Sequence, residues 1–155
     1  VPPRFMNEEL CHRNMAFSLY QADEMPLIRM GETSVEKFGG DVFRVFVDIT
    51  NAKVTPTIMA RAAQNNVVRP DLLLVEGKSA EVIAASFIEN KTLYKANPSV
   101  TPLIDQKDLK RIIVRNGHPG KTTRTAVLLV KGSGAVTVVY DSVKGGKASK
   151  TVTLK

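Results

Sequence analysis

The sequence is poor in the residue types on which most catalytic and metal-binding sites depend. It has one cysteine (Cys11), two histidines and no tryptophan among 155 residues. A single cysteine excludes an intrachain disulfide and a multi-cysteine zinc site. The histidines, His12 and His118, lie far apart, and neither belongs to an H-x-x-E or H-E-x-x-H pair. The residues therefore predict no catalytic site, no metal site and no bound cofactor in this chain.

The glycine-rich stretches also lack the context that nucleotide or acyl-transfer chemistry needs. Phosphate loops and nucleophile elbows lead from a strand into a helix. Here Lys131-GSG and Lys144-GGK each lead into another β-type run. Ser133 is therefore expected at a hairpin tip, and we predict that the chain is not an enzyme by itself.

Long apolar runs are absent as well. No stretch approaches the roughly 20 apolar residues that span a bilayer, so no membrane span is expected. The first ten residues, VPPRFMNEEL, lack both an initiator methionine and the apolar core of a signal peptide. We interpret the chain as a piece of a longer protein, and its own residues do not indicate a compartment.

What the chain does contain first is a helical segment. Between Met6 and Ala22 there is no glycine, proline or β-branched residue, and Glu8 and Glu9 suit a helix N-terminus. We predict a helix over about 7–22, ended by Pro26, within a connecting segment of residues 1–30. Apolar residues fall at helical spacing along it in two adjacent rows.

From residue 31 to residue 155 the pattern is that of β-structure. The clearest strand covers residues 41–50, where Phe43, Val45, Val47 and Ile49 share one face. A short helix or helical turn is expected at 57–66, Pro70 at an edge, a bulge or the start of a strand, and an irregular connection at 91–108. Seven or eight strands separated by glycine turns predict a mainly β domain, an antiparallel β-sandwich that is immunoglobulin-like or similar, preceded by one N-terminal α-helix. The absence of a cysteine pair and of tryptophan argues against an antibody-type domain.

Charge is divided unevenly between the halves. Residues 1–77 carry 8 Lys/Arg against 10 Asp/Glu, and residues 78–155 carry 14 against 5. Two interpretations fit this division of charge. The lysines lie at strand edges and turns and keep the domain soluble, or the basic half is a binding module for an anionic glycan or protein partner. Nucleic acid is not expected, because aromatic residues are scarce in the basic half. The candidate interaction surface comprises Phe17, Leu19, Phe46, Tyr94 and Tyr140.

Four stretches give the chain a family resemblance. The segment from Cys11 to Pro26, CHRNMAFSLYQADEMP, resembles the one that follows the catalytic domain of bacterial zinc carboxypeptidases. Stretches 43–60, 65–77 and 134–154 are similar to the C-terminal β domain that these proteins often carry. All four stretches belong to structural elements, and none is an active-site signature.

The resemblance implies a role and a partner. Residues 6–22 would be the connecting helix after the peptidase domain, and residues 33–155 a non-catalytic accessory sandwich that packs against that domain or positions it. The family binds zinc through two histidines and a glutamate in the peptidase domain. No residue here matches that motif, so no catalytic residue is carried over. Such enzymes are usually exported, which implies an extracytoplasmic location: periplasmic, cell-surface or secreted.

Overall fold

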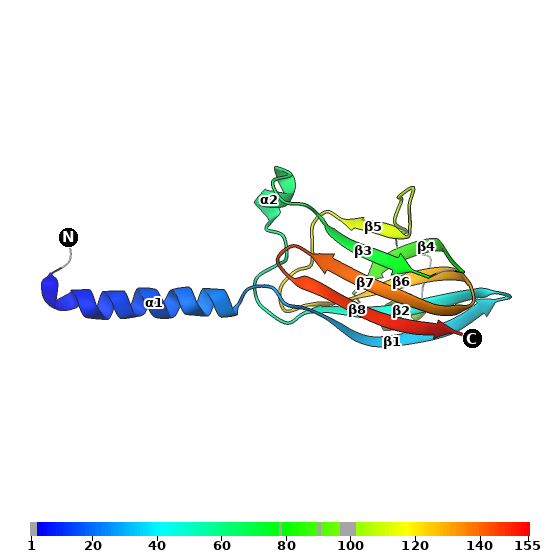
Figure 1. Ribbon diagram of the computed structural model, residues 1–155, viewed down its shortest axis with the longest axis horizontal. Helices are drawn as coiled ribbons and strands as arrows, with labels where there is room; N and C mark the ends of the chain where they lie inside the picture. The colour runs from blue at the N-terminus through cyan, green and yellow to red at the C-terminus, as the bar shows by residue number, and fades with distance from the viewer. Residues whose placement is uncertain (1–2, 78, 90, 97–101) are drawn as a thin grey trace.

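The protein folds into two stacked antiparallel sheets with one long helix at the N-terminus (Figure 1). The computed structural model describes residues 3–77, 79–89, 91–96 and 102–155. The predicted mainly β sandwich preceded by one helix is confirmed. The helical elements are a 3₁₀ turn Arg4–Met6, α1 Asn7–Asp23, α2 Ala60–Gln64 and α3 Lys91–Ala96. The strands are β1 Ile28–Gly39, β2 Val42–Asn51, β3 Asp71–Glu76, β4 Ala80–Ile88, β5 Arg111–Val114, β6 Thr123–Gly132, β7 Gly134–Ser142 and β8 Gly146–Leu154.

Each sheet has four strands. Sheet A has the order β1-β2-β6-β4, and sheet B has the order β5-β3-β7-β8. The chain forms hairpins at β1–β2 and β7–β8. Every connection from β2 to β7 crosses from one sheet to the other. The backbone N–H of Ile28 donates to the carbonyl of Gly145 at 3.0 Å, which ties β1 to the β7–β8 turn where the sheets meet.

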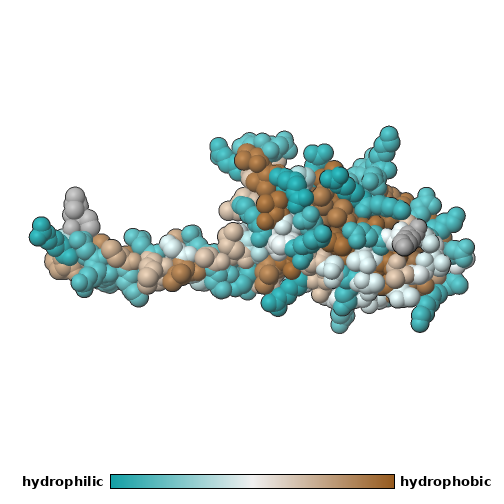
Figure 2. All heavy atoms as spheres, viewed as in Figure 1, coloured by the Kyte–Doolittle hydropathy of each residue, from teal (hydrophilic) through white to brown (hydrophobic). Residues whose placement is uncertain are grey.

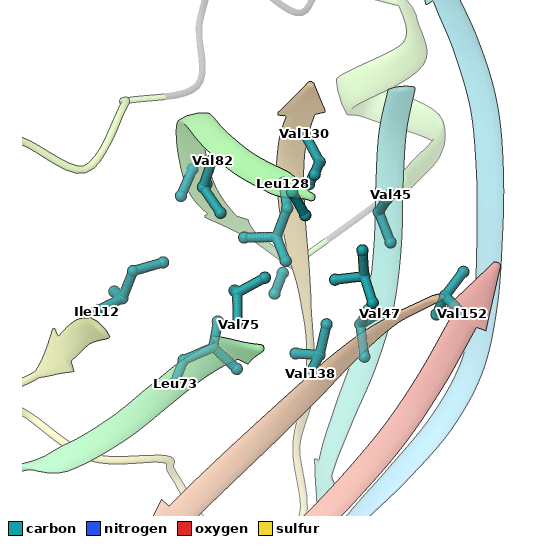
Figure 3. Close-up of a cluster of buried hydrophobic side chains, with 14 of the residues drawn as sticks. Val45, Val47, Leu73, Val75, Val82, Ile112, Leu128, Val130, Val138 and Val152 are labelled. Atoms are coloured by element: carbon teal, nitrogen blue, oxygen red, sulfur yellow. The ribbon is translucent and has the colours of Figure 1, made fainter. Parts of the chain in front are cut away.

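The core lies between the sheets and consists of the alternating aliphatic residues of the strands. Val45, Val47, Leu73, Leu128 and Val138 are fully buried, and Figure 3 shows such side chains from both sheets pointing toward one another. The predicted inward face of residues 41–50 is confirmed, because Phe43, Val45, Val47 and Ile49 all lie in this cluster. Burial of each such side chain stabilises the fold by roughly 1.5–3 kcal/mol.

A second, smaller cluster lies on the outer face of sheet A. Phe46 packs there with Ile88 and Val127, and its ring meets that of Tyr94 edge to face with centroids 6.0 Å apart. Tyr94 belongs to α3, which is held on the sheet by an ion pair between Lys91 and Asp48 at 2.7 Å. Phe46 is 1% exposed, so its assignment to an interaction surface was wrong. Phe46, an apolar residue on the otherwise polar face of β2, is here covered by α3.

Three boundaries differ from the sequence interpretation. β1 begins at Ile28, inside the segment 1–30 assigned to the connection, because Ile28 is buried and bonded to Gly145. Within 57–66, where a short helix or helical turn was expected, the helical part is limited to the five residues of α2. The expected irregular connection at 91–108 begins with α3, and its residues 97–101, which include Asn97-Pro98, lie outside the described residues. Pro70 immediately precedes β3, as predicted.

Candidate interaction surface at the helix-bearing end

Helix α1 projects from one end of the sandwich without packing on it (Figure 1). None of its 17 residues is buried, and Phe17 and Leu19 are 60% and 62% exposed. Helices in proteins gain most of their stability from packing of an apolar face against other elements. Two of the five predicted interaction residues, Phe17 and Leu19, are therefore exposed on an element that lacks a packing partner among the described residues.

Apolar side chains occur on two sides of this helix. Leu10 and Phe17 are seven residues apart and share one row, whereas Met15 and Leu19 are four apart and share another. At about 100° per residue, Phe17 and Leu19 point to roughly opposite sides of the helix axis. A helix lying on a flat surface needs only one apolar stripe. Apolar residues on both sides are typical of a helix with neighbours on both sides.

The root of α1 is fixed to the loop that follows β2. Lys53 Nζ donates to Asp23 Oδ2 at 2.7 Å, and this hydrogen bond raises the pKa of Lys53. The backbone N–H of Val54 donates to Glu24 Oε2 at 2.9 Å. Beneath them the buried Asn51 accepts the N–H groups of Leu27 and Lys53, each at 3.2 Å. The loop at 51–54 thus sets the direction in which α1 leaves the sandwich.

The same loop continues into a buried polar cluster around Asp71. Thr57 donates its hydroxyl to Asp71 Oδ2 at 2.5 Å, and Tyr140 donates its phenol to the same oxygen at 3.0 Å. The other oxygen, Oδ1, has no hydrogen-bond partner among the described residues. Tyr140 is 1% exposed, so its assignment to an interaction surface was wrong. Burial raises the pKa of the Tyr140 phenol, and the charge of Asp71 raises it further. The phenol therefore stays protonated and remains a hydrogen-bond donor.

His118 completes this cluster. Its backbone N–H donates to the Thr57 hydroxyl at 2.7 Å, and its carbonyl accepts the N–H of Thr57 at 3.0 Å. Its ring nitrogens lie 3.0 Å from the carbonyl of Pro119 and 2.9 Å from that of Ile49. Burial lowers the pKa of His118, and a neutral imidazole donates to only one of two carbonyls. The cluster joins the loop after β2 to the loop before β6.

Sequence reasoning missed this cluster. Thr57, Asp71 and His118 lie in three separate segments, and only the crossing connections bring them together. The one signal is a charged residue, Asp71, that directly follows Pro70 and begins the buried run of β3. A buried carboxylate is rarely left without donors. From this one can expect a hydrogen-bond donor beside Asp71, but the sequence does not identify which residue supplies it.

Exposed apolar side chains gather at the helix-bearing end of the molecule. Of the sixteen large apolar side chains that are exposed in the described ranges, ten lie on α1, at its root or on the loops around that root, and two more lie in the 3₁₀ turn that precedes α1. They are Phe5, Met6, Met15, Phe17, Leu19, Tyr20, Met25, Leu27, Val54, Met59, Val67 and Val143. Single exposed apolar residues are ordinary, but a gathering at one end marks an interaction site.

A groove lies beside α2 at this end. Its volume is about 740 Å³, and its walls include Pro56, Ile58, Val68, Pro70 and Pro119. Figure 2 shows hydrophobic side chains beside α2 with hydrophilic ones around them. The groove and the root of α1 are formed by the two ends of one loop, since Lys53 and Val54 hold the helix while Pro56 and Ile58 line the groove.

The uneven charge division is partly internal to the fold. Lys91 pairs with Asp48 at 2.7 Å, and Lys95 pairs with Glu36 at 2.6 Å. In both cases a cation of the basic half neutralises an anion of the acidic half. Tyr94 lies between these two lysines and is half-buried against Phe46, so its ring serves mainly to cover sheet A.

Other candidate chemistry is dispersed. His12 is exposed on α1, whereas His118 is buried in the sandwich. Over residues 3–77, 79–89, 91–96 and 102–155, no three His, Cys, Asp or Glu side chains gather as metal ligands would. In the same ranges no helix has the length and apolarity needed to cross a bilayer.

Fold and surface together define an antiparallel β-sandwich domain with a projecting helix at one end. The chain belongs to the family described as Domain of unknown function (DUF8731), whose model matches residues 27–153. The matched range begins after α1 and covers all eight strands except the last residue of β8. Comparison with curated proteins and with solved structures finds no match.

Proposed function

We propose that this chain is a non-catalytic accessory domain whose helix-bearing end packs against another protein body and holds the sandwich in a fixed orientation to it. The observation that carries the proposal is the gathering of exposed apolar side chains on α1 and around its root. In this proposal α1 is part of the core of the other body, with neighbours on both its sides.

The energy available from this packing is large for one helix. A side chain such as Phe17, Leu19 or Met15 stabilises a structure by roughly 1.5–3 kcal/mol when it becomes fully buried. Several such side chains on α1 offset the cost of ordering the helix. Because Asp23 and Glu24 tie the helix to the loop after β2, the sandwich would follow the helix rigidly.

The resemblance of residues 11–26 and of three stretches of the sandwich to zinc carboxypeptidases supplies the identity of the other body. We take it to be a zinc-dependent peptidase domain on the N-terminal side, in an exported protein. Zinc and the catalytic groups would belong to that domain, and the sandwich would stabilise or position it.

The test uses the polypeptide encoded together with its upstream region. A zinc-ligand motif upstream of Val1 is expected, with metal-dependent removal of C-terminal residues from peptides. The double variant Phe17→Asp/Leu19→Asp should lower the melting temperature of the upstream body by more than about 5 °C. The control Asn7→Asp/Ser18→Asp adds the same charge at polar positions of α1 that lie between the Phe17 and Leu19 rows, and it should shift the melting temperature by less than about 2 °C.

Two results would count against the proposal in different ways. Equal melting of both double variants would show that α1 is not packed in the other body. An upstream region without zinc ligands would remove the peptidase identity and leave the packing role in place. Separately, the 155-residue chain alone should hydrolyse no peptide above a metal-free control.

A further inference from the structure

The groove beside α2 is open because α2 is too short to cover it. This helix has five residues, and none of them is buried. Asn66, with φ of 51°, ends the helical turn in the left-handed region that asparagine tolerates better than most residues. Met59 and Val67, on either side of α2, are 52% and 74% exposed. An apolar hollow of about 740 Å³ is therefore left at the surface, which is within the usual size range of ligand sites.

The charge of the groove has one sign. Its charged lining residues are Arg69 and Arg115, and no carboxylate lines it among the described residues. Arg69 donates to both carboxylate oxygens of Asp141, at 3.1 and 3.4 Å, which fixes its guanidinium in place. Arg115 is exposed and forms no ion pair with the described residues. A guanidinium presents several N–H donors suited to a carboxylate, so the groove favours an acidic occupant.

The lining also limits the form of that occupant. None of the described residues that line the groove is aromatic, and grooves that bind proline-rich peptides or single-stranded nucleic acid are lined by aromatics. Gln64, Asn66 and Asn116 lie along it, and amide side chains both donate to and accept from a peptide backbone. Apolar walls, amides and the guanidinium of Arg115, unpaired among the described residues, match an extended peptide in which an acidic residue flanks an apolar one.

The position of the groove indicates where this peptide comes from. Pro56 and Ile58 line the groove, and the intervening Thr57 is locked to Asp71. Three residues earlier, Val54 holds Glu24 at the root of α1. A body that surrounds α1 would therefore lie next to the groove. We infer that the groove takes an acidic, apolar-containing extended segment of the same body that packs on α1, which makes it a second contact of that interface. This inference rests on the proposed function.

The test selects the occupant without assuming its sequence. The 155-residue chain is immobilised and a displayed library of random seven-residue peptides is selected on it, with the Arg115→Glu variant used in parallel. Peptides with Asp or Glu beside Leu, Ile, Val or Met should be enriched on the natural chain. One enriched peptide is then synthesised with capped ends, together with a version in which Asn and Gln replace the acidic residues.

Binding of the synthetic peptides is measured by calorimetry at low and high salt. Arg115→Glu should weaken binding of the acidic peptide at least tenfold, and Arg115→Gln should weaken it less. Lys37→Glu, the same charge reversal on the β1–β2 hairpin, should leave binding within twofold. The neutral peptide should bind at least tenfold more weakly than the acidic one, and added salt should narrow that difference. Circular dichroism verifies that each variant is folded.

Three outcomes would overturn the inference. The first is no enrichment, or enrichment of neutral or basic peptides. The second is equal binding by the natural chain and by Arg115→Glu. The third is a dimer in sedimentation experiments that Arg115→Glu abolishes, because the occupant would then be a second copy of the chain. None of these depends on α1 variants in the longer polypeptide, so a failure here is distinguishable from a failure of the proposed packing of α1.

Discussion

Removal of one hydroxyl tests whether the buried Asp71 cluster stabilises the sandwich. In Tyr140→Phe the ring stays in the core, but Asp71 Oδ2 loses one of its two donors and keeps only Thr57. A hydrogen bond to a charged group contributes about 1.5–3 kcal/mol, and its loss leaves a buried acceptor less satisfied. We expect the free energy of unfolding to fall by about 2 kcal/mol.

The measurement is equilibrium unfolding in urea, followed by circular dichroism because the chain has no tryptophan. With a slope of about 2 kcal/mol per molar urea, the midpoint should fall by about 1 M with the slope unchanged. Tyr20→Phe is the matched control. Tyr20 is 60% exposed on α1, and its substitution should change the free energy by less than about 0.5 kcal/mol.

A double-mutant cycle separates the hydrogen bond from other effects of the substitution. Asp71→Ala and Tyr140→Phe remove the two ends of the same interaction, so their combined effect should fall short of the sum by at least about 1 kcal/mol. Additive effects, or a Tyr140→Phe midpoint equal to that of the natural chain, would refute the reasoning. The cluster would then be a consequence of the fold and would contribute little to its stability.

Three further perturbations have expected results that equilibrium unfolding can measure. Burial lowers the pKa of His118 in the folded state, so below about pH 6.5 the unfolded chain binds more protons than the folded chain does. The free energy of unfolding should therefore fall as pH drops from about 7.5 to 5. This fall should be shallower in His118→Gln. Gly120→Ala would place a methyl group 1.7 Å from a backbone carbonyl oxygen and should cost more than about 3 kcal/mol, whereas Gly39→Ala, which meets no atom within 4 Å, should be nearly neutral. Phe46→Ala empties the cluster under α3 and should cost about 3–5 kcal/mol, against less than about 1 for Phe38→Ala, whose ring is 61% exposed. Equal effects within either matched pair, or identical pH profiles with and without His118, would contradict these assignments.

The fold could be predicted because its signals are local. Alternation along residues 41–50 gave a strand with one buried face, and the glycines near residues 132 and 145 gave the turns that bound β7. It was harder to predict from the sequence whether the outer face of a strand is exposed or covered. Phe46 was assigned to a surface because it interrupts a polar face, but α3 covers that face. Whether an aromatic side chain on an outer face is exposed depends on what crosses over it, and local sequence does not contain that information.

The candidate surface could be predicted only in part. Phe17 and Leu19 were identified because helical spacing is visible in sequence, and both are exposed. The groove beside α2 could not be identified, since Pro56, Arg69 and Arg115 are brought together by three separate loops. Tyr140 shows the same limit: its position in an alternating strand fits either face, and its buried partner, Asp71, is 69 residues away.

The repeated crossing of the chain between β2 and β7 has a consequence for how the domain forms and fails. Neither layer consists of a contiguous stretch of chain, so any fragment that contains one complete sheet also contains strands of the other sheet. Pairing β2 with β6 requires closure of a loop of about seventy residues before any of its contacts form. Assembly should therefore be slow and cooperative, as in other sandwiches rich in non-local pairing. A protease cut anywhere between β3 and β6 in the unfolded chain would separate the strands of both layers at once.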